Sequence, residues 1–219
     1  MVSSQVTLGS QFRSLRDQVV DNLRDRIVEG ELPGGHRLVE RDLSDELEVS
    51  RITIREGLQQ LTAEGLVIQL PRRGSVVTEF GIVEIRNLLE LREPLEVLTA
   101  RLAAERHDNA GAKRLQAVHA ESRNALERGS LQAAAAASVQ FHEEIGRCTG
   151  NMLLETHMAS LQGHLRRLFW LTREHQTHHV DEHARLLEAI LTRQAELAEQ
   201  LAREHIQETA AATLKLLTL

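Results

Sequence analysis

One histidine stands in a segment whose other side chains are mostly small, apolar or acidic. His142 directly follows Phe141 in the stretch ASVQFHEEI, residues 137–145. Imidazole is a common metal ligand, but it is also found in protein interiors with a hydrogen-bond partner. The residue types alone leave two interpretations open: a structural histidine, or one ligand of a site whose other members lie elsewhere in the chain.

A second group of histidines has helical spacing. His175, His179 and His183 stand at i, i+4 and i+8 among the 11 histidines of the chain. If a helix began early enough, this spacing would place three imidazoles on one face, and three imidazoles suit a metal such as zinc. The surrounding run REHQTHHVD is polar and favours a loop, so this cluster is a competing hypothesis.

The usual motifs of catalytic metal sites are missing. No E-x-x-H pattern occurs, and HEEIG at residues 142–146 departs from the zinc-protease pattern H-E-x-x-H at its last position. No glycine-rich phosphate loop follows a predicted strand. Cys148 is the only cysteine, which excludes an intrachain disulfide and thiolate metal clusters. We therefore expect a binding protein and not an enzyme.

Arginines near the amino terminus are arranged in a way that suits DNA. Arg51 and Arg55 stand one helical turn apart in RITIREGLQQLTAEG, and Arg72 and Arg73 precede a glycine in PRRGS. The net charge of −6 argues against non-specific coating of nucleic acid, and four Phe, one Trp and no Tyr are too few for a base-stacking platform. This pattern favours duplex DNA read through a groove, although solvated surface charge is the alternative for each arginine.

The elements expected around these arginines form a winged helix-turn-helix. A helix over residues 12–29 and a GELPGG turn precede two short helices, RDLSDEL and RITIREGLQQLTAEG, which the brief turn EVS separates. In the second helix an apolar stripe is expected to pack on its neighbours, and Ser50 can accept hydrogen bonds from its first free amides. The stripe consists of Ile54, Leu58 and Leu61. Residues 66–80, LVIQLPRRGSVVTEF, predict a hairpin with a basic tip, the wing.

The rest of the chain is predicted to be helical. We place a boundary near residue 80, which gives a winged helix-turn-helix domain at 10–79 and an all-helical bundle domain of about six helices at 82–219, so the fold class is mainly α. Breaks are expected at HDNAG (107–111), RGS (128–130), TGN (149–151), REHQTHHVD (173–181) and TRQ (192–194). With no secretory signal and no apolar run of about 20 residues, we expect a soluble, cytoplasmic protein.

The amino-terminal segment ERDLSDELEVSRITIREGLQQLTAEGLV, followed by PRRGSVV, resembles the DNA-binding domain of GntR-type bacterial transcription regulators, and the match spans residues 14–79. The resemblance implies DNA contacts at Arg41, Ser50, Arg51, Thr53, Arg55 and the wing-tip Gly74, to which Arg73 adds a basic wing residue. Two positions depart from the family pattern. Val39 stands where a capping Ser or Asn is common, and Gly57 replaces the usual Ala at a cost of about 1 kcal/mol in helix propensity.

Residues 82–219 resemble the FCD-type ligand-binding domain that accompanies this DNA-binding domain in one large branch of the family. The matching segments are ELREPLEVLTARLAAER, FHEEIGRCTGNMLLE and EHARLLEAILTRQAELAEQLAREHI. The resemblance implies a homodimer and, in the metal-binding members, a site of one Asp and three His. His142, His183 and His205 stand at the three histidine positions, and Ser138 stands at the position of the Asp.

Simple geometry is compatible with this set. A continuous helix would separate His183 and His205 by about 33 Å, but the break near TRQ lies halfway, so two helices can fold back and bring both rings to one level. Three imidazoles with open positions suit zinc, nickel or a similar ion, and neutral ligands leave its charge available to an anion. Because Ser138 lacks a carboxylate, three hypotheses remain: a three-histidine site completed by water or ligand, recruitment of Glu143 or Glu144, or a pocket without metal.

Arginines of the helical domain are candidates for binding an effector. Arg92 and the pair Arg166 and Arg167 could clamp a carboxylate through their planar forks, although helix-surface charge is the alternative. We therefore expect a homodimeric repressor that binds double-stranded operator DNA and is controlled by a small carboxylate effector, with a divalent metal as cofactor. The alternatives are a regulator whose effector is the metal ion itself and a helical metalloprotein or hydrolase.

Overall fold

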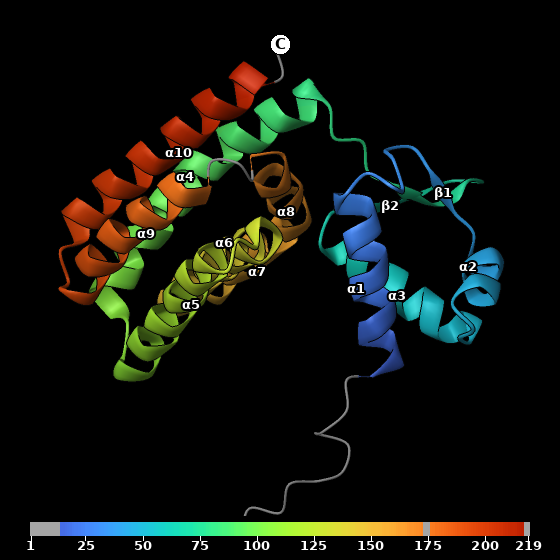
Figure 1. Ribbon diagram of the computed structural model, residues 1–219, viewed down its shortest axis with the longest axis horizontal. Coiled ribbons are helices and arrows are strands. Elements are labelled where there is room, and N and C mark those ends of the chain that lie inside the picture. Colours follow the sequence, from blue (N-terminus) through green and yellow to red (C-terminus); the bar gives the residue numbers. More distant parts are fainter. Residues whose placement is uncertain (1–13, 173–175, 217–219) are drawn as a thin grey trace, which may run out of the picture. The chain divides into compact units, whose positions relative to one another are not determined.

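In the computed structural model, which describes residues 14–172 and 176–216, the chain forms two compact units that divide between Glu79 and Phe80. The described part of the first unit holds helices and a small sheet, and that of the second holds helices alone (Figure 1). The predicted fold class, a winged helix-turn-helix followed by a helical bundle, is confirmed.

The first unit consists of three helices and a three-stranded sheet in its described residues. Its elements are α1 (Leu15–Val28), β1 (Arg37–Leu38), α2 (Glu40–Glu46), α3 (Arg51–Ala63), β2 (Val67–Leu70) and β3 (Gly74–Val77). The central strand β3 pairs antiparallel with β1 and with β2. The β2–β3 hairpin matches the predicted wing. The strand β1 was not predicted, because two residues are too short to show an alternating pattern.

The predicted apolar stripe of α3 forms the core of this unit. Ile54, Leu58 and Leu61 are each 1% exposed or less, and they belong to one buried cluster with Leu23 and Ile27 of α1. Their spacing of three to four residues places all three on the inner face of the helix. The opposite face of α3, which carries Arg51 and Arg55, therefore remains exposed.

The two departures from the family pattern can now be placed. Val39 occupies the N-cap position of α2 and provides no side-chain hydrogen bond there. Gly57 is buried in α3, where a β-carbon would lie only 3.0 Å from Cγ1 of Val19 in α1. The missing side chain allows the two helices to approach closely, which offsets the helix propensity lost at this glycine.

Seven helices are described in the second unit, one more than predicted. They are α4 (Ile82–Arg106), α5 (Asn109–Glu127), α6 (Leu131–Cys148), α7 (Met152–Ser160), α8 (Gln162–Leu171), α9 (Gln176–Leu191) and α10 (Ala195–Leu216). The additional break lies at Leu161, where no Gly or Pro marks it. At the predicted breaks RGS and TGN, Gly129 and Gly150 adopt positive φ angles of 72° and 62°, which end the preceding helices.

Helix α6 lies in the middle of the second unit. It contacts α4, α5, α7, α8 and α9, while α10 packs along α4 (Figure 1). Small residues such as Ala134, Ala135 and Ala137 are buried on α6 and allow neighbouring helices to come close. On the carboxy-terminal half of α6, His142 and Glu144 are buried, and their partners Glu96 and Arg114 come from α4 and α5.

Candidate functional site

Three histidines from three helices meet inside the second unit. His142 of α6, His183 of α9 and His205 of α10 are 5%, 1% and 3% exposed. One ring nitrogen from each lies within 4.8 Å of the other two, and this is the set among the described residues that could hold a metal ion. These are the three histidines that the family resemblance implies as ligands.

The reversal between α9 and α10 brings two of these rings together. Arg193 adopts a positive φ of 57° at the predicted break TRQ, so the chain turns back and α10 packs against α9. The guanidinium of Arg193 donates hydrogen bonds of 2.9 and 2.8 Å to the carbonyl oxygens of Glu105 and His107, at the end of α4. This turn sets His183 and His205 at one level, with ring centroids 4.8 Å apart.

Two carboxylates orient the rings of His142 and His205. The Nδ1 atom of His142 lies 2.7 Å from Oε2 of Glu96, and the Nδ1 atom of His205 lies 2.6 Å from Oε2 of Glu182. The Nε2 atoms of His142 and His205 and both ring nitrogens of His183 are buried without a hydrogen-bond partner. Buried polar atoms are normally paired, and a carboxylate on one histidine nitrogen commonly accompanies a metal on the other. The donor set fits a divalent ion.

Burial also keeps two of the rings in the form that ligates metals. Desolvation, together with the neighbouring histidines, lowers the pKa of His183 and of His205 well below the ordinary value. Both imidazoles are therefore neutral at physiological pH. A metal ligand must have a free lone pair, so neutral rings are ready to bind without first losing a proton.

Arg92 lies in the interior next to this site. Its side chain is fully buried, pairs with Glu96 on the same helix and lies over the ring of Phe169, 5.1 Å from the centroid. Burial alone would raise the pKa of Glu96, but Arg92 and His142 together hold it well below its usual range. Arg92 was a candidate for binding the effector, whereas in the fold its ion-pair partner is a carboxylate of the protein.

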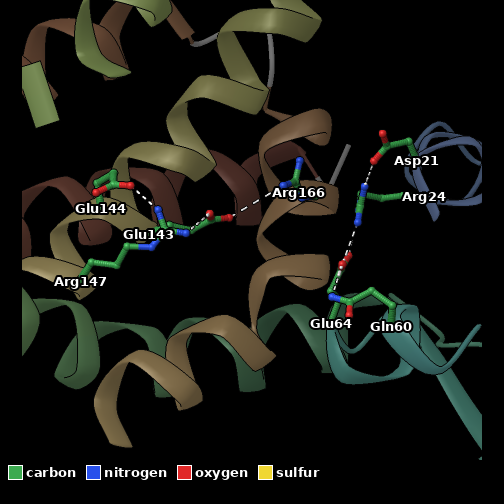
Figure 2. Close-up of polar contacts among 8 residues, drawn as sticks. All are labelled: Asp21, Arg24, Gln60, Glu64, Glu143, Glu144, Arg147 and Arg166. Atoms are coloured by element: carbon green, nitrogen blue, oxygen red, sulfur yellow. Dashed lines mark hydrogen bonds and ion pairs between the residues drawn. The ribbon is translucent and has the colours of Figure 1, made fainter. Parts of the chain in front are cut away.

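The position of the missing aspartate is also buried. Ser138 is 0% exposed and precedes His142 by one turn of α6. Glu143 and Glu144, the carboxylates considered as replacements, are not in the histidine set. Glu144 pairs with Arg114 and Arg147, and Glu143 lies 3.8 Å from Arg166 (Figure 2). Glu143 and Glu144 therefore do not join the histidines, and the carboxylates that contact the histidine rings are Glu96 and Glu182.

The competing histidine cluster can be placed only in part, because His175 lies outside the described residues. The expectation of a loop at REHQTHHVD was wrong from Gln176 on, where α9 begins, so His179 and His183 lie one turn apart on the same helix. His179 is 4% exposed, with its ring centroid 5.5 Å from that of His205. It borders the three histidines without belonging to the set whose nitrogens converge.

A cavity of about 80 Å³ opens beside His142. Its walls come from α6, α7 and α8 and are lined by Val139, His142, Glu143, Gly146, Arg147, Glu155, Met158, Ala159, Gln162 and Leu165. Arg166 is the neighbour of Leu165 and contacts Glu143 across this region (Figure 2). A second space of about 10 Å³ is bordered by Glu96, His142 and His205. His142 lines both spaces and can contact both a metal and a small ligand.

Arg147 and Glu155 of this cavity were not predicted from the sequence. Arg147 follows His142 by five residues on α6 and pairs with Glu144, while Glu155 comes from α7 and lies 3.8 Å from Arg147. Arg147 carried no signal in its helical spacing, because five residues along a helix place it about 140° around the axis from His142. No local pattern marks Glu155, because only the turn between α6 and α7 brings it there.

A second candidate surface lies on the first unit. Ser50 caps α3 by accepting a 3.1 Å hydrogen bond from the Thr53 amide, and its hydroxyl lies 2.8 Å from that of Thr53. Arg51 begins the helix and is exposed. A capped helix amino terminus beside an exposed arginine suits the phosphate and base edges of DNA.

The wing and helix α3 border a groove of about 450 Å³. It is lined by Arg37, Leu38, Val39, Glu40, Arg55, Leu58, Gln59, Gln69, Arg73, Gly74 and Ser75. Arg72 and Gly74 adopt positive φ angles of 64° and 74°, which form the tight turn at the wing tip. Arg41 lies outside the groove, exposed, with its guanidinium 3.0 Å from Asp42. Arg37 was not predicted as a residue of this groove, because the strand β1 that carries it was not predicted.

The family assignment follows from this architecture and from matching family models. The model for bacterial regulatory proteins of the gntR family matches residues 15–77, and the FCD domain model matches residues 87–208. The chain belongs to the GntR family, in the branch that carries an FCD domain. GntR-family proteins are regulators of transcription and not enzymes, as the sequence analysis expects.

Known GntR-family proteins resemble the chain over most of its length. An uncharacterized HTH-type transcriptional regulator of Paraburkholderia xenovorans, BphR, is 30% identical over 91% of this chain and 85% of its own. The HTH-type transcriptional repressor RspR of Escherichia coli is 25% identical over 89% of this chain and 86% of its own. The solved structure of E. coli McbR/YncC, 22% identical, has a TM-score of 0.75 and covers 93% of this chain and 99% of that one, which shows a shared fold.

The GntR helix-turn-helix makes this chain a DNA-binding transcription regulator. Within the described residues, none of the helices has the length and apolar character needed to cross a membrane.

Proposed function

We propose that this chain is a homodimeric repressor whose operator affinity is set by a small carboxylate effector bound next to a divalent metal in the FCD domain. The observation that carries the proposal is the set of partnerless, buried ring nitrogens on His142, His183 and His205. A bound zinc or nickel ion would supply positive charge with open positions, the chemistry that attracts a carboxylate. Repression is proposed because the relative RspR is a repressor.

The chain's own residues prepare this site for an anion. Glu96 and Glu182 hold the rings of His142 and His205 in place, so that the Nε2 atoms of these two histidines face the interior. Arg147 lines the adjacent cavity, and Arg166 lies against its wall through Glu143. The volume of about 80 Å³ favours a compact acid over a long-chain one. An effector that binds one arrangement of the dimer more tightly shifts the populations and therefore changes the affinity for DNA.

Elemental analysis tests the metal site directly. Untagged parent protein is expected to contain about one zinc or nickel ion per chain, and His142→Ala is expected to lose it. His157→Ala is the matched control, because His157 is an exposed histidine outside the cluster. Parent protein without metal after incubation with zinc, followed by dialysis, would exclude the metal from the proposal.

The effector can be separated from the metal by measuring DNA binding. A duplex selected from a random library by the full-length protein serves as the operator, and short mono- and dicarboxylic acids are titrated into the complex. Release of DNA by an acid, lost in Arg147→Ala, supports an organic effector. Release by chelation alone, with no response to any acid, would instead make the metal ion the effector.

A further inference from the structure

A single acidic residue lies in the basic groove between α3 and the wing. The groove is lined by Arg37, Arg55 and Arg73, yet Glu40 stands among them. Each phosphate of DNA carries a negative charge, so a carboxylate on a DNA-binding surface weakens the electrostatic part of binding. The presence of Glu40 therefore needs a reason other than overall affinity.

The Glu40 carboxylate accepts two hydrogen bonds from one edge of the Arg55 guanidinium. The Nε and Nη2 atoms of Arg55 donate hydrogen bonds of 3.0 and 2.7 Å to Oε1 and Oε2 of Glu40. The two residues are far apart in sequence, since Glu40 begins α2 and Arg55 belongs to α3. This bidentate pair fixes the plane of the guanidinium, and the remaining donors lie on its other edges.

The pair is open to solvent and to DNA. The Arg55 side chain is 59% exposed and that of Glu40 is 33% exposed. The hydrogen bond to Arg55 lowers the pKa of Glu40, so the carboxylate remains ionised when the groove meets DNA. An arginine held in this way approaches the duplex with its fork already oriented, and its side-chain entropy is lost before binding.

We propose that Glu40 is a specificity-determining residue that positions Arg55 for base edges and keeps it from the DNA backbone. A free arginine can reach a phosphate on any sequence, because its stem is long and flexible. Held by Glu40, Arg55 presents a planar donor edge suited to the two acceptors of guanine in the major groove. The carboxylate also repels a phosphate that enters the groove. Glu40 thus lowers affinity for random DNA and increases discrimination.

The neighbouring pair Arg41 and Asp42 does not have this geometry. Its side chains are 67% and 60% exposed, and the two residues are adjacent in the chain. This pair connects no second helix and does not line the groove. Glu40 is therefore placed to position an arginine in the groove, whereas Asp42 is not.

The experiment compares full-length variants on two duplexes. The parent protein first selects a preferred site from a random duplex library, and dissociation constants are then measured on that site and on a scrambled duplex over a salt series. In Glu40→Gln, binding to the scrambled duplex is expected to tighten, and the ratio of the two constants is expected to fall by about tenfold or more. The salt slope should steepen by about one, as for one added phosphate contact.

Two further variants separate positioning from bulk charge. Glu56→Gln removes one negative charge from an exposed position of α3 and is expected to change both constants by the same factor. In an Arg55→Ala background, Glu40→Gln should no longer change the ratio, because the residue it positions is absent. An unchanged ratio in Glu40→Gln, or an equal fall in the Arg55→Ala background, would overturn the proposal.

A second substitution at position 40 covers the case in which Glu40→Gln fails to fold. Glu40→Asp keeps the negative charge but shortens the reach to Arg55, so discrimination should fall while the salt slope stays close to that of the parent. Retention of full discrimination in Glu40→Asp would also count against positioning. Failure of the parent to select any sequence would instead contradict DNA reading by this domain, a result distinct from a failed Glu40 test.

Discussion

The Nδ1 atom of His142 lies 2.7 Å from Oε2 of Glu96, and this hydrogen bond connects helices α6 and α4 of the FCD domain. Glu96 also pairs with the fully buried Arg92, so that a chain of three residues ends at the partnerless Nε2 of His142. The same connection explains why a buried arginine and a buried glutamate are tolerated: each neutralises the other, and the histidine takes up the remaining acceptor.

Glu182→Gln is expected to weaken metal binding by about 10- to 100-fold while the protein stays folded. Glu182 accepts the hydrogen bond from Nδ1 of His205, and a neutral amide oxygen can still accept it but makes the ring a weaker ligand. Competition of the protein with a coloured zinc chelator measures the affinity. Glu188→Gln, on the exposed face of the same helix, is the control. Equal zinc affinities in the two variants would contradict a supporting role for Glu182.

Ser138→Asp is expected to tighten zinc binding by about tenfold or more, because it adds a charged ligand one turn from His142. The same substitution should lower the melting temperature of metal-stripped protein, since a buried carboxylate without an ion is costly. Ser138→Ala is the matched control and should keep the metal content of the parent. Loss of metal in Ser138→Ala would show that the hydroxyl is itself required.

Arg24→Ala is expected to destabilise the DNA-binding unit by about 2–3 kcal/mol. Arg24 donates hydrogen bonds of 2.8 and 2.7 Å to Glu64, whose side chain is only 7% exposed (Figure 2). The substitution leaves this carboxylate buried without its cation. Arg26→Ala should cost about 0–1 kcal/mol, because its partners Glu31 and Glu46 are 62% and 51% exposed.

Urea unfolding followed by two signals locates this effect. Far-ultraviolet circular dichroism reports both units, whereas the single tryptophan, Trp170, lies in the second unit. In Arg24→Ala the dichroism transition should move to lower urea while the fluorescence transition remains in place. A shift of the fluorescence transition alone would mean that Arg24 does not stabilise the first unit.

Cys148 is expected to react with a thiol reagent at pH 8 about 100-fold more slowly than the unfolded chain. Burial raises the pKa of its thiol from 9.0 to about 11. Between these values the unfolded chain loses the proton and the folded chain keeps it, so stability should fall as pH rises above about 9. Rates of labelling with and without urea test the slow reaction of Cys148. Labelling of the folded protein at the rate of the unfolded chain would refute it.

The sequence predicted the DNA-binding domain closely, for reasons of local physics. The Ser50 cap, the stripe of Ile54, Leu58 and Leu61, and the basic hairpin tip are each encoded within a few residues. Short-range patterns of this kind determine helices and turns with little help from the rest of the chain. The break at Leu161 and the strand β1 escaped prediction because neither has a Gly, a Pro or a periodic pattern of its own.

The cluster of three histidines was predicted in part. The three histidines were identified from the family resemblance. The predicted break at TRQ indicated that the helices of His183 and His205 could fold back and bring the two rings together. Glu96 and Glu182 were not identified, because an acidic residue on a helix is most often solvated and nothing in its local sequence says otherwise. Their role depends on which helices pack against α6 and α9, and at what register.

The sequence by itself determined that this protein is a GntR-type regulator with a winged helix-turn-helix and a helical FCD domain, since caps, apolar stripes and motif spacing act over one or two turns. Only the tertiary structure decided which carboxylates contact the candidate functional side chains. Glu96 contacts His142, Glu182 contacts His205 and Glu40 contacts Arg55. Each pair joins residues from different helices, and their distances come from the packing of whole helices, which no local period encodes.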